Sequence, residues 1–436
     1  MRKNEMMTDQ RPVSVFESSY FGADRRIGSI PVGGMPLFIG STVRGGLDVS
    51  VLRRVIADLA AAHPLLRSEQ VDVEGARCFR RDDSYRPRLT ITEGGEPEYL
   101  DLVNSRQDWT AGLFHAHLLR DGEHERIVLA IHHGIADGRS AFALLAELWE
   151  RYTAQMTGAS APHANPDQSL PEAMDTRLAR IVSPEEVAGL LDVLRAGAEM
   201  MTSDLTPRQL PPLGDGAHRP NRLTLDRIEL DDIETAAVIA AARVHGVSVN
   251  SLVAGAAFAA FRARLEPSAG ALPMVCGHAV DIRANLVPPL PASTVLNCVS
   301  GVGTFALVEA DADPIVLAHA VATGMRASVE RKEALLMMLA TQRVVDPATA
   351  ALLSAPPTFA ISNIGRVPAL SIPPRLRIVR NDVFAMTAGM PPKLTVFTIG
   401  DRMTIQVEYD TARHSPAQLG AVRQALIRTL ATVRAA

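Results

Sequence analysis

The sequence predicts an α+β protein of two domains, and three observations support this. The chain has 436 residues, long enough for each of two domains to bury its own core. Patterns typical of strands and of helices occur in both halves, and a segment rich in proline and polar residues divides them. We expect an N-terminal domain over residues 1–180, a partly helical crossover over 181–221 and a C-terminal domain over 222–436.

Helix and strand patterns follow one another in the first half. Apolar residues on one face predict a helix that begins after Asp48 and ends in His-Pro-Leu-Leu-Arg at residues 63–67. The apolar run 127–131 follows a charged turn and predicts a buried strand. Apolar residues at steps of three and four then predict a helix over residues 140–152.

The crossover is predicted from its composition. Residues 157–171 and 205–221 are rich in proline and small or polar residues. Between them, residues 184–201 have the apolar periodicity of a helix. We therefore expect a connection between the domains that is partly helical.

The second half again mixes strands with helices. The predicted elements are a strand at 222–229, a helix at 231–245, a helix at 251–261, a hairpin of 394–399 with 403–409, and a last helix from Ser415-Pro416. Asn250 is the expected N-cap of the second helix. The apolar stretch 252–261 fits either a core helix or the lining of an acyl-chain channel, and its composition favours the core.

Composition argues against several classes of protein. The net charge is only −4, and no basic patch with interleaved aromatic residues indicates a nucleic-acid partner. Residues 1–11 lack the apolar core of a signal peptide, and no apolar run approaches the ~20 residues of a transmembrane segment. The three cysteines, Cys78, Cys276 and Cys298, are odd in number and lack metal-binding spacing, which indicates reduced thiols in the cytoplasm.

The most informative stretch is Ile-His-His-Gly-Ile-Ala-Asp-Gly at residues 131–138. It lies between the predicted strand and the predicted helix, in a loop of the kind that often carries catalytic side chains. His133 ends the apolar run and precedes Asp137 by four residues, a spacing that suggests a general base with structural support. Asp137 or Ser140 is also suited to cap the following helix.

Two other interpretations of this stretch remain open. The pair His132-His133 is equally suited to a core in which both rings are satisfied. A metal site is the third alternative, because His133 and Asp137 are ligand types and His115 and His117 alternate along another predicted strand. We expect no metal, because zinc sites usually need three or four converging ligands and no further cluster has the required spacing.

The motif His-His-x-x-x-Asp-Gly resembles the signature of the CoA-dependent acyltransferase superfamily. That superfamily includes chloramphenicol acetyltransferases, condensation domains of nonribosomal peptide synthesis, plant acyltransferases and polyketide-associated acyltransferases of actinobacteria. Further matching stretches follow in the same order along most of the chain: 47–67, 132–153, 246–261, 279–283 with 288–289 and 296–297, and 362–365. The resemblance is greatest to the phthiocerol/phthiodiolone dimycocerosyl transferase type.

This resemblance implies a fold and a reaction. Two chloramphenicol acetyltransferase-like domains would meet at a channel with the histidine motif at their interface. His133 would act as general base, so that a hydroxyl of a polyketide, lipid or other secondary metabolite attacks a thioester directly, without an acyl-enzyme. The donor would be an acyl-CoA or an acyl-carrier protein, which is a substrate and not a cofactor. We expect no other cofactor and a monomer.

The resemblance also assigns supporting roles. Asp137 would point away from the substrates and pair with an arginine of the other domain, here Arg283, so its role would be to hold the loop that aims His133. His132 is expected to be a packing or hydrogen-bonding neighbour. Gly138 is expected to let the loop approach the opposite domain closely.

An oxyanion donor is the remaining requirement of the reaction. Ser362 and Asn363 are candidates through their place in the Ser-Asn-Ile-Gly element. The alternative for Asn363 is a hydrogen bond to backbone at the end of a strand.

Two alternatives to the O-acyltransferase stay open. One is an amide-forming, free-standing condensation enzyme. The other is a non-catalytic module that docks carrier proteins, which the joint presence of His133, Asp137 and Arg283 disfavours. Because Arg139-Ser140 and the 362–365 element depart from the nearest family pattern, the acceptor in particular is undetermined.

Overall fold

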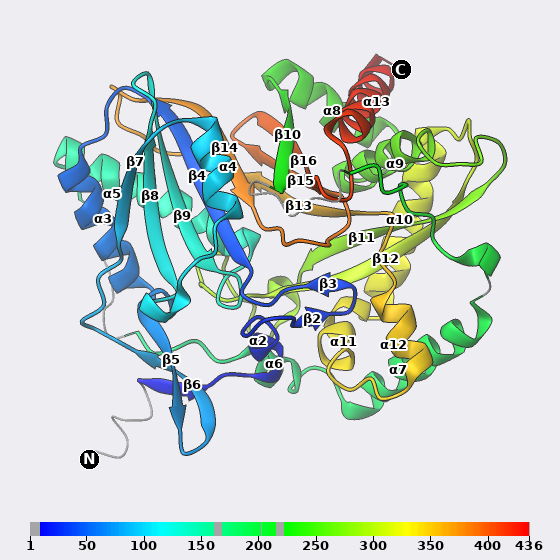
Figure 1. Ribbon diagram of the computed structural model, residues 1–436, viewed down its shortest axis with the longest axis horizontal. Coiled ribbons are helices and arrows are strands. Elements are labelled where there is room, and N and C mark those ends of the chain that lie inside the picture. Colours follow the sequence, from blue (N-terminus) through cyan, green and yellow to red (C-terminus); the bar gives the residue numbers. More distant parts are fainter. Residues whose placement is uncertain (1–8, 161–167, 202, 215–221, 436) are drawn as a thin grey trace.

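Two β-sheets form the framework of the protein. The computed structural model describes residues 9–160, 168–201, 203–214 and 222–435. A five-stranded sheet belongs mainly to the first half of the chain and a six-stranded sheet to the second half, and the two lie beside each other (Figure 1). This is the two-lobed α+β architecture that the sequence predicts.

The five-stranded sheet has the strand order β14-β4-β9-β8-β7. Its strands are β4 (Pro36–Arg44), β7 (Leu89–Glu93), β8 (Phe114–Arg120), β9 (His124–His132) and β14 (Arg377–Phe384). Neighbours are antiparallel except β7 and β8. Helices α3 (Val49–Ala62) and α5 (Gly138–Thr157) pack together on its outer face, and α4 (Glu96–Asn104) lies beside β10 of the other sheet (Figure 1).

The six-stranded sheet has the order β10-β16-β15-β13-β11-β12. Its strands are β10 (Leu223–Leu230), β11 (Leu272–Asp281), β12 (Val299–Val308), β13 (Phe359–Val367), β15 (Lys393–Ile399) and β16 (Arg402–Asp410). Helices α8 (Asp232–Val244), α9 (Val249–Arg262), α10 (Pro314–Glu330) and α13 (Pro416–Ala435) cover the face that points away from the first lobe (Figure 1).

Shorter elements complete the molecule below the two sheets (Figure 1). Helix α7 (Pro184–Met200) packs against α11 (Glu333–Ala340) and α12 (Pro347–Ser354), and α6 (Met174–Leu178) packs against α2 (Val15–Ser18) and α11. The small sheets are β1 (Gln10–Pro12) with β5 (Ser68–Val73) and β6 (Ala76–Arg81), and β2 (Arg26–Ile27) with β3 (Ile30–Pro31). The single-turn 3₁₀ helices are Pro64–Arg67, Trp109–Ala111, Ser203–Leu205 and Arg283–Asn285.

The structure confirms the predicted helices and strands and corrects one boundary. Helix α9 begins at Val249 and its N-cap is Ser248, whose hydroxyl accepts the Ser251 N–H at 3.0 Å. The prediction of Asn250 as N-cap was therefore wrong, because the serine two residues earlier takes the position and Asn250 lies in the first turn. The apolar residues of α9 are buried in the core of the second lobe, so they do not line a channel.

We propose residues 181–221 as the connection between the domains, on the composition of the sequence. Strand β14 comes from the second half of the chain but pairs with β4, so the second half contributes one strand to the first sheet. Residues 161–167 and 215–221, which belong to the two proline-rich stretches, lie outside the described residues.

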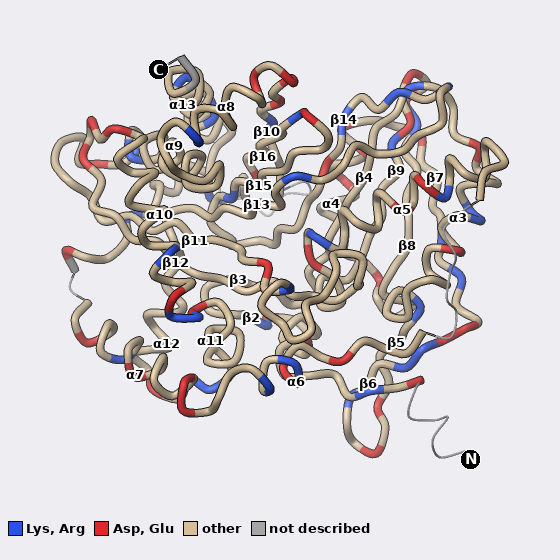
Figure 2. Tube along the Cα trace, turned by 180° about the vertical axis from the view of Figure 1, so that it is seen from behind, with Lys and Arg blue, Asp and Glu red and all other residues tan. Residues whose placement is uncertain are grey.

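The distribution of charged residues, the cysteines and the hydropathy of the helices can be followed in the structure. Acidic and basic residues are interspersed over both halves (Figure 2). The three cysteines are buried and free. Within the described ranges no single helix is long and apolar enough to cross a bilayer; α8 and α9 pass such a test only as a pair, and they are bent by 95°.

Candidate active site

The loop between β9 and α5 carries the histidine motif at the boundary of the two lobes. Strand β9 ends at His132, and α5 begins at Gly138 with Asp137 as its N-cap. The backbone N–H of His133 donates to the carbonyl of Met35 at 3.0 Å, which fixes the start of the loop. The N-cap is a reciprocal capping box, because the Asp137 carboxylate accepts the Ser140 N–H and the Ser140 hydroxyl accepts the Asp137 N–H, both at 3.0 Å.

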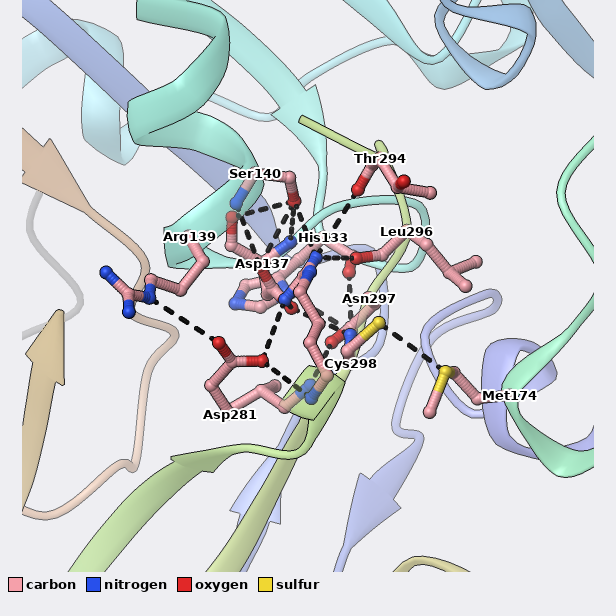
Figure 3. A network of polar contacts seen from close by, with 12 residues as sticks. His133, Asp137, Arg139, Ser140, Met174, Asp281, Thr294, Leu296, Asn297 and Cys298 are labelled. Atoms are coloured by element: carbon pink, nitrogen blue, oxygen red, sulfur yellow. Dashed lines mark hydrogen bonds and ion pairs between the residues drawn. The ribbon is translucent and has the colours of Figure 1, made fainter. Parts of the chain in front are cut away.

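His133 faces a large cavity and is held from two sides. Its ring lines a cavity of about 930 Å³. The ring of Tyr20 stacks on it with centroids 5.4 Å apart. Nδ2 of Asn297, from the second lobe, donates to the His133 carbonyl at 2.8 Å and lies 3.5 Å from the ring Nδ1 (Figure 3). Both lobes therefore fix the position of this imidazole.

The environment of His133 keeps its imidazole neutral. Burial lowers the pKa of His133 below its ordinary value of 6.5, against the opposing effects of backbone hydrogen bonds and the Asp137 carboxylate; the charge of Lys393 lowers it further. A neutral imidazole can accept a proton at pH 7, which is what a general base must do.

His132 is a packed neighbour and does not line the cavity. Its ring stacks on Phe21 with centroids 4.0 Å apart, and its Nδ1 accepts the Gly134 N–H at 3.0 Å. Burial, and secondly the neighbouring His133, lower the pKa of His132 to about 3. These contacts fit a role in positioning the loop.

Asp137 and Arg283 form a buried ion pair between the lobes. Nη1 of Arg283 lies 2.6 Å from Oδ2 of Asp137, and the same oxygen accepts the Cys298 N–H at 2.7 Å (Figure 3). Nη2 of Arg283 donates to the Leu296 carbonyl at 2.6 Å. The carboxylate is thus directed toward the second lobe and the segment that carries Asn297.

Gly138 lies where the lobes approach each other most closely at the motif. A Cβ atom at this position would overlap Cδ1 of Ile364 on β13. Gly138 also lines the cavity beside His133. The absence of a side chain therefore lets α5 start directly against the opposite lobe.

The structure separates the two oxyanion candidates. Ser362 lines the same cavity as His133, whereas Asn363 lines a second pocket on the other side of β13. The amide oxygen of Asn363 accepts the Gly365 N–H at 2.9 Å, next to a bulge in the strand. Asn363 is therefore engaged with its own backbone, and only Ser362 shares a space with the imidazole.

The two pockets meet near the motif. The larger one is lined mostly by apolar side chains, while the second, of about 550 Å³, is lined by more polar ones, including Arg139 and Arg326. His278, Ala279 and Ile364 line both. Two spaces of different chemistry therefore adjoin next to the motif.

The histidines of β8 do not form a metal centre with the motif. The rings of His115 and His117 contact each other at 5.2 Å, and His115 Nε2 lies 2.8 Å from Oε1 of Gln107. In the part of the chain that the structure describes, no group of three or more His, Cys, Asp or Glu residues is placed to hold a metal ion.

Comparison with known proteins relates this geometry to a family. Residues 219–408 match the family described as phthiocerol/phthiodiolone dimycocerosyl transferase C-terminus. A protein named phthiocerol/phthiodiolone dimycocerosyl transferase from Mycobacterium sp. (strain JLS) is 25% identical over 377 residues, which cover 84% of this chain and 87% of that protein. The chain is a distant homologue of these acyltransferases.

Solved structures of similar proteins share the fold of this chain. Polyketide synthase associated protein 5 from Mycobacterium tuberculosis superposes with a TM-score of 0.69 at 20% identity, covering 97% of this chain and 98% of that one. The trichothecene 15-O-acetyltransferase of Fusarium sporotrichioides superposes with a TM-score of 0.73 at 12% identity, covering 98% and 95%. The fold class predicted from the sequence is confirmed.

Three residues around the candidate site were not predicted from the sequence. Asn297 was noticed only as part of a matching stretch, although its amide holds His133. Tyr20 gave no signal, since an isolated tyrosine near the beginning of the chain has no motif of its own. Lys393 precedes an apolar run, and no local pattern places it in the cavity with His133.

Proposed function

We propose that the protein transfers an acyl group from a thioester to a hydroxyl of a polyketide, lipid or other secondary metabolite, with His133 as general base. The observation that carries this proposal is the neutral imidazole of His133 in the wall of a large apolar cavity, fixed by both lobes. The homologous acyltransferases support it. The relatives are named for transfer to phthiocerol or phthiodiolone, and we infer a bulky hydrophobic alcohol as acceptor here.

The reaction needs one proton carrier. Nε2 of His133 takes the proton of the acceptor hydroxyl while its oxygen bonds to the thioester carbonyl carbon. The tetrahedral intermediate then expels the thiolate, which takes the proton from the imidazolium, so that an ester and a free thiol result. Because Nε2 acts as the base, the neutral imidazole carries its own proton on Nδ1, where the backbone carbonyls of His133 and Ala136 are acceptors for it.

The remaining groups position the base or stabilise charge. The Ser362 hydroxyl is the candidate donor to the oxyanion, since it lines the cavity with His133. Asp137 and Arg283 hold the loop between the lobes, and His132 and Gly138 set its packing. Much of the rate acceleration would come from holding donor and acceptor in line.

We infer that the two pockets receive different parts of the substrates. The apolar cavity suits hydrocarbon chains. The second pocket suits the phosphate-bearing arm of an acyl-CoA or an acyl-carrier protein, because Arg139 and Arg326 line it and outnumber the acidic Asp281 there. We expect the protein to act as a monomer in the cytoplasm, which the free cysteines suit.

The test is release of free thiol from acyl-CoAs of increasing chain length, with alcohols and amines as acceptors. Acceptor-dependent release that falls by about 10²–10⁴-fold in His133→Ala would support general-base catalysis. Faster reaction with alcohols than with amines would separate ester from amide formation. If a folded wild type releases no thiol from acyl-CoAs or acyl-carrier proteins, the docking module becomes the better explanation.

A further inference from the structure

A buried lysine lies in the wall of the apolar cavity, outside the histidine motif. Among the described residues that line this cavity, Lys393 is the only lysine or arginine. It is 8% exposed, although lysine is almost never so deeply buried without a partner. The cavity therefore contains one fixed cation in mostly apolar surroundings.

Lys393 is held in place by two acceptors. It begins β15 and lies opposite Glu408 of β16 in the antiparallel register. Its Nζ is 2.9 Å from Oε2 of Glu408, which is fully buried, and donates to the Ala385 carbonyl at 2.6 Å. The Thr395 hydroxyl donates to the other Glu408 oxygen. The ammonium group is thus fixed relative to the cavity and to His133.

Structural stability alone does not account for this arrangement. A buried ion pair is often no more stabilising than apolar residues of the same volume, because both charges lose their hydration. Here the surroundings are apolar, so two hydrophobic residues would be suited to the same place. The ammonium group carries three N–H donors. One donates to the Ala385 carbonyl and the ion pair with Glu408 occupies a second direction, which leaves the third for a ligand in the cavity.

We propose that Lys393 is a specificity-determining residue that donates a hydrogen bond to a neutral oxygen of the substrate, a hydroxyl or carbonyl group other than the reacting one. This inference rests on the proposed function, since it takes the cavity as the binding site of a reactant. It narrows the substrate class to hydrophobic molecules with a second oxygen.

A neutral oxygen fits this site better than a carboxylate. Glu408 already balances the charge of Lys393, so an added carboxylate would find no uncompensated positive charge at this point of the cavity. A hydroxyl or carbonyl oxygen accepts the free N–H without adding charge. A plain hydrocarbon chain at that point would leave the buried N–H without an acceptor, which disfavours its binding.

The test compares ligands that differ by one oxygen. Binding to the full chain is measured by calorimetry for 1-decanol against decanediols with the second hydroxyl at each successive carbon, and for decanoyl-CoA against 3-hydroxydecanoyl-CoA. In one of the two series we expect the wild type to bind an oxygenated ligand about tenfold more tightly than its plain counterpart, the usual effect of a hydrogen bond to a charged group. Lys393→Met should abolish this preference and, because it removes the unpaired donor, should not weaken binding of the plain ligand.

Two further variants keep the result interpretable. Lys332→Met removes an exposed lysine that is paired with Glu186 at 2.8 Å, and it should retain the preference. Lys393→Met/Glu408→Gln removes both charges and covers the case in which the single variant leaves Glu408 unpaired and fails to fold. A preference that persists in the double variant would overturn the proposal.

Other outcomes are equally decisive. Lys393 would be a purely structural residue if the wild type shows no preference for oxygenated ligands in either series. The same holds if Lys393→Met loses affinity equally for plain and oxygenated ligands. Thiol release measured on the same proteins separates the two proposals: release without an oxygen preference refutes only the role of Lys393, and a preference without release refutes only the acyl transfer.

Discussion

Asp137 and Arg283 connect the two lobes at the start of the helix that follows the active-site loop. Their side chains are 4% and 3% exposed and their charged atoms are 2.6 Å apart. Arg283 also holds the Leu296 carbonyl, next to Asn297 whose amide contacts His133. The ion pair therefore connects the loop that carries His133 in one lobe with the Asn297 segment that holds His133 from the other lobe.

Breaking this pair should destabilise the protein. Asp137→Asn keeps the size of the side chain but removes the buried counter-ion of Arg283, which keeps only the partly exposed Asp281 at 3.1 Å. We expect a loss of about 3–5 kcal/mol in the free energy of unfolding, the usual range when one partner of a buried pair is removed. Denaturant unfolding of wild type and variant measures it.

Asp401→Asn is the matched control, because Asp401 and Arg366 form an exposed pair with side chains 73% and 67% exposed. It should change the free energy of unfolding by less than about 1 kcal/mol. Equal effects of the two substitutions would contradict a special role for the buried pair.

The pH dependence of the reaction should report the lowered pKa of His133. The neutral imidazole is the active form, so kcat/KM falls as the pH drops through the pKa of His133. Because burial lowers that pKa, the midpoint of the acid limb should lie below pH 6.5. Lys393 lowers the same pKa, so Lys393→Met should move the limb to higher pH, whereas Lys332→Met should leave it in place. If the midpoint of the acid limb in the wild type lies above pH 6.5, the surroundings of the His133 imidazole are more polar than the structure indicates.

Buried histidines should make the fold sensitive to acid. Burial lowers the pKa of His115 and His132 to about 3, and that of His117 and His278 to about 4. The unfolded chain therefore binds protons that the folded protein does not, and stability that is fully present above pH 6.5 is lost as the pH falls toward these values. The slope approaches about 1.4 kcal/mol per pH unit for each such proton.

His117→Leu is the variant that isolates one of these protons. Nε2 of His117 is buried without a hydrogen-bond partner, so leucine removes a titrating group and no side-chain hydrogen bond at that atom. Between pH 6 and 4 the free energy of unfolding should fall less steeply with decreasing pH in the variant than in the wild type. The difference in slope should correspond to at most one bound proton. Parallel curves for the two proteins would mean that His117 is hydrated when folded.

The sequence predicted the arrangement of the motif but not the cavity around it. The apolar strand, the loop and the amphipathic helix are predicted from local patterns. The prediction of the fold depended on the resemblance to a family along most of the chain. The pairing of Lys393 with Glu408 also follows from the hairpin, since the two residues are equally far from the turn at 400–401. Their burial depends instead on the packing of one lobe against the other, which no local pattern records. The same applies to Tyr20, which reaches His133 only through the tertiary fold.

The close approach of Gly138 and Ile364 gives the last prediction. A methyl group at position 138 would overlap Cδ1 of Ile364, the end of a flexible side chain, so the lobes would have to adjust. We expect Gly138→Ala to cost about 1–3 kcal/mol in the free energy of unfolding, the usual range for overpacking, and to slow acyl transfer by displacing the loop that carries His133. Ile364→Val removes the overlapping methyl group, so the cost of Gly138→Ala should be smaller in that background. Unfolding and thiol release measured for the two single variants and the double variant give the coupling energy. Additive effects would show that the two lobes do not meet through these two residues in solution.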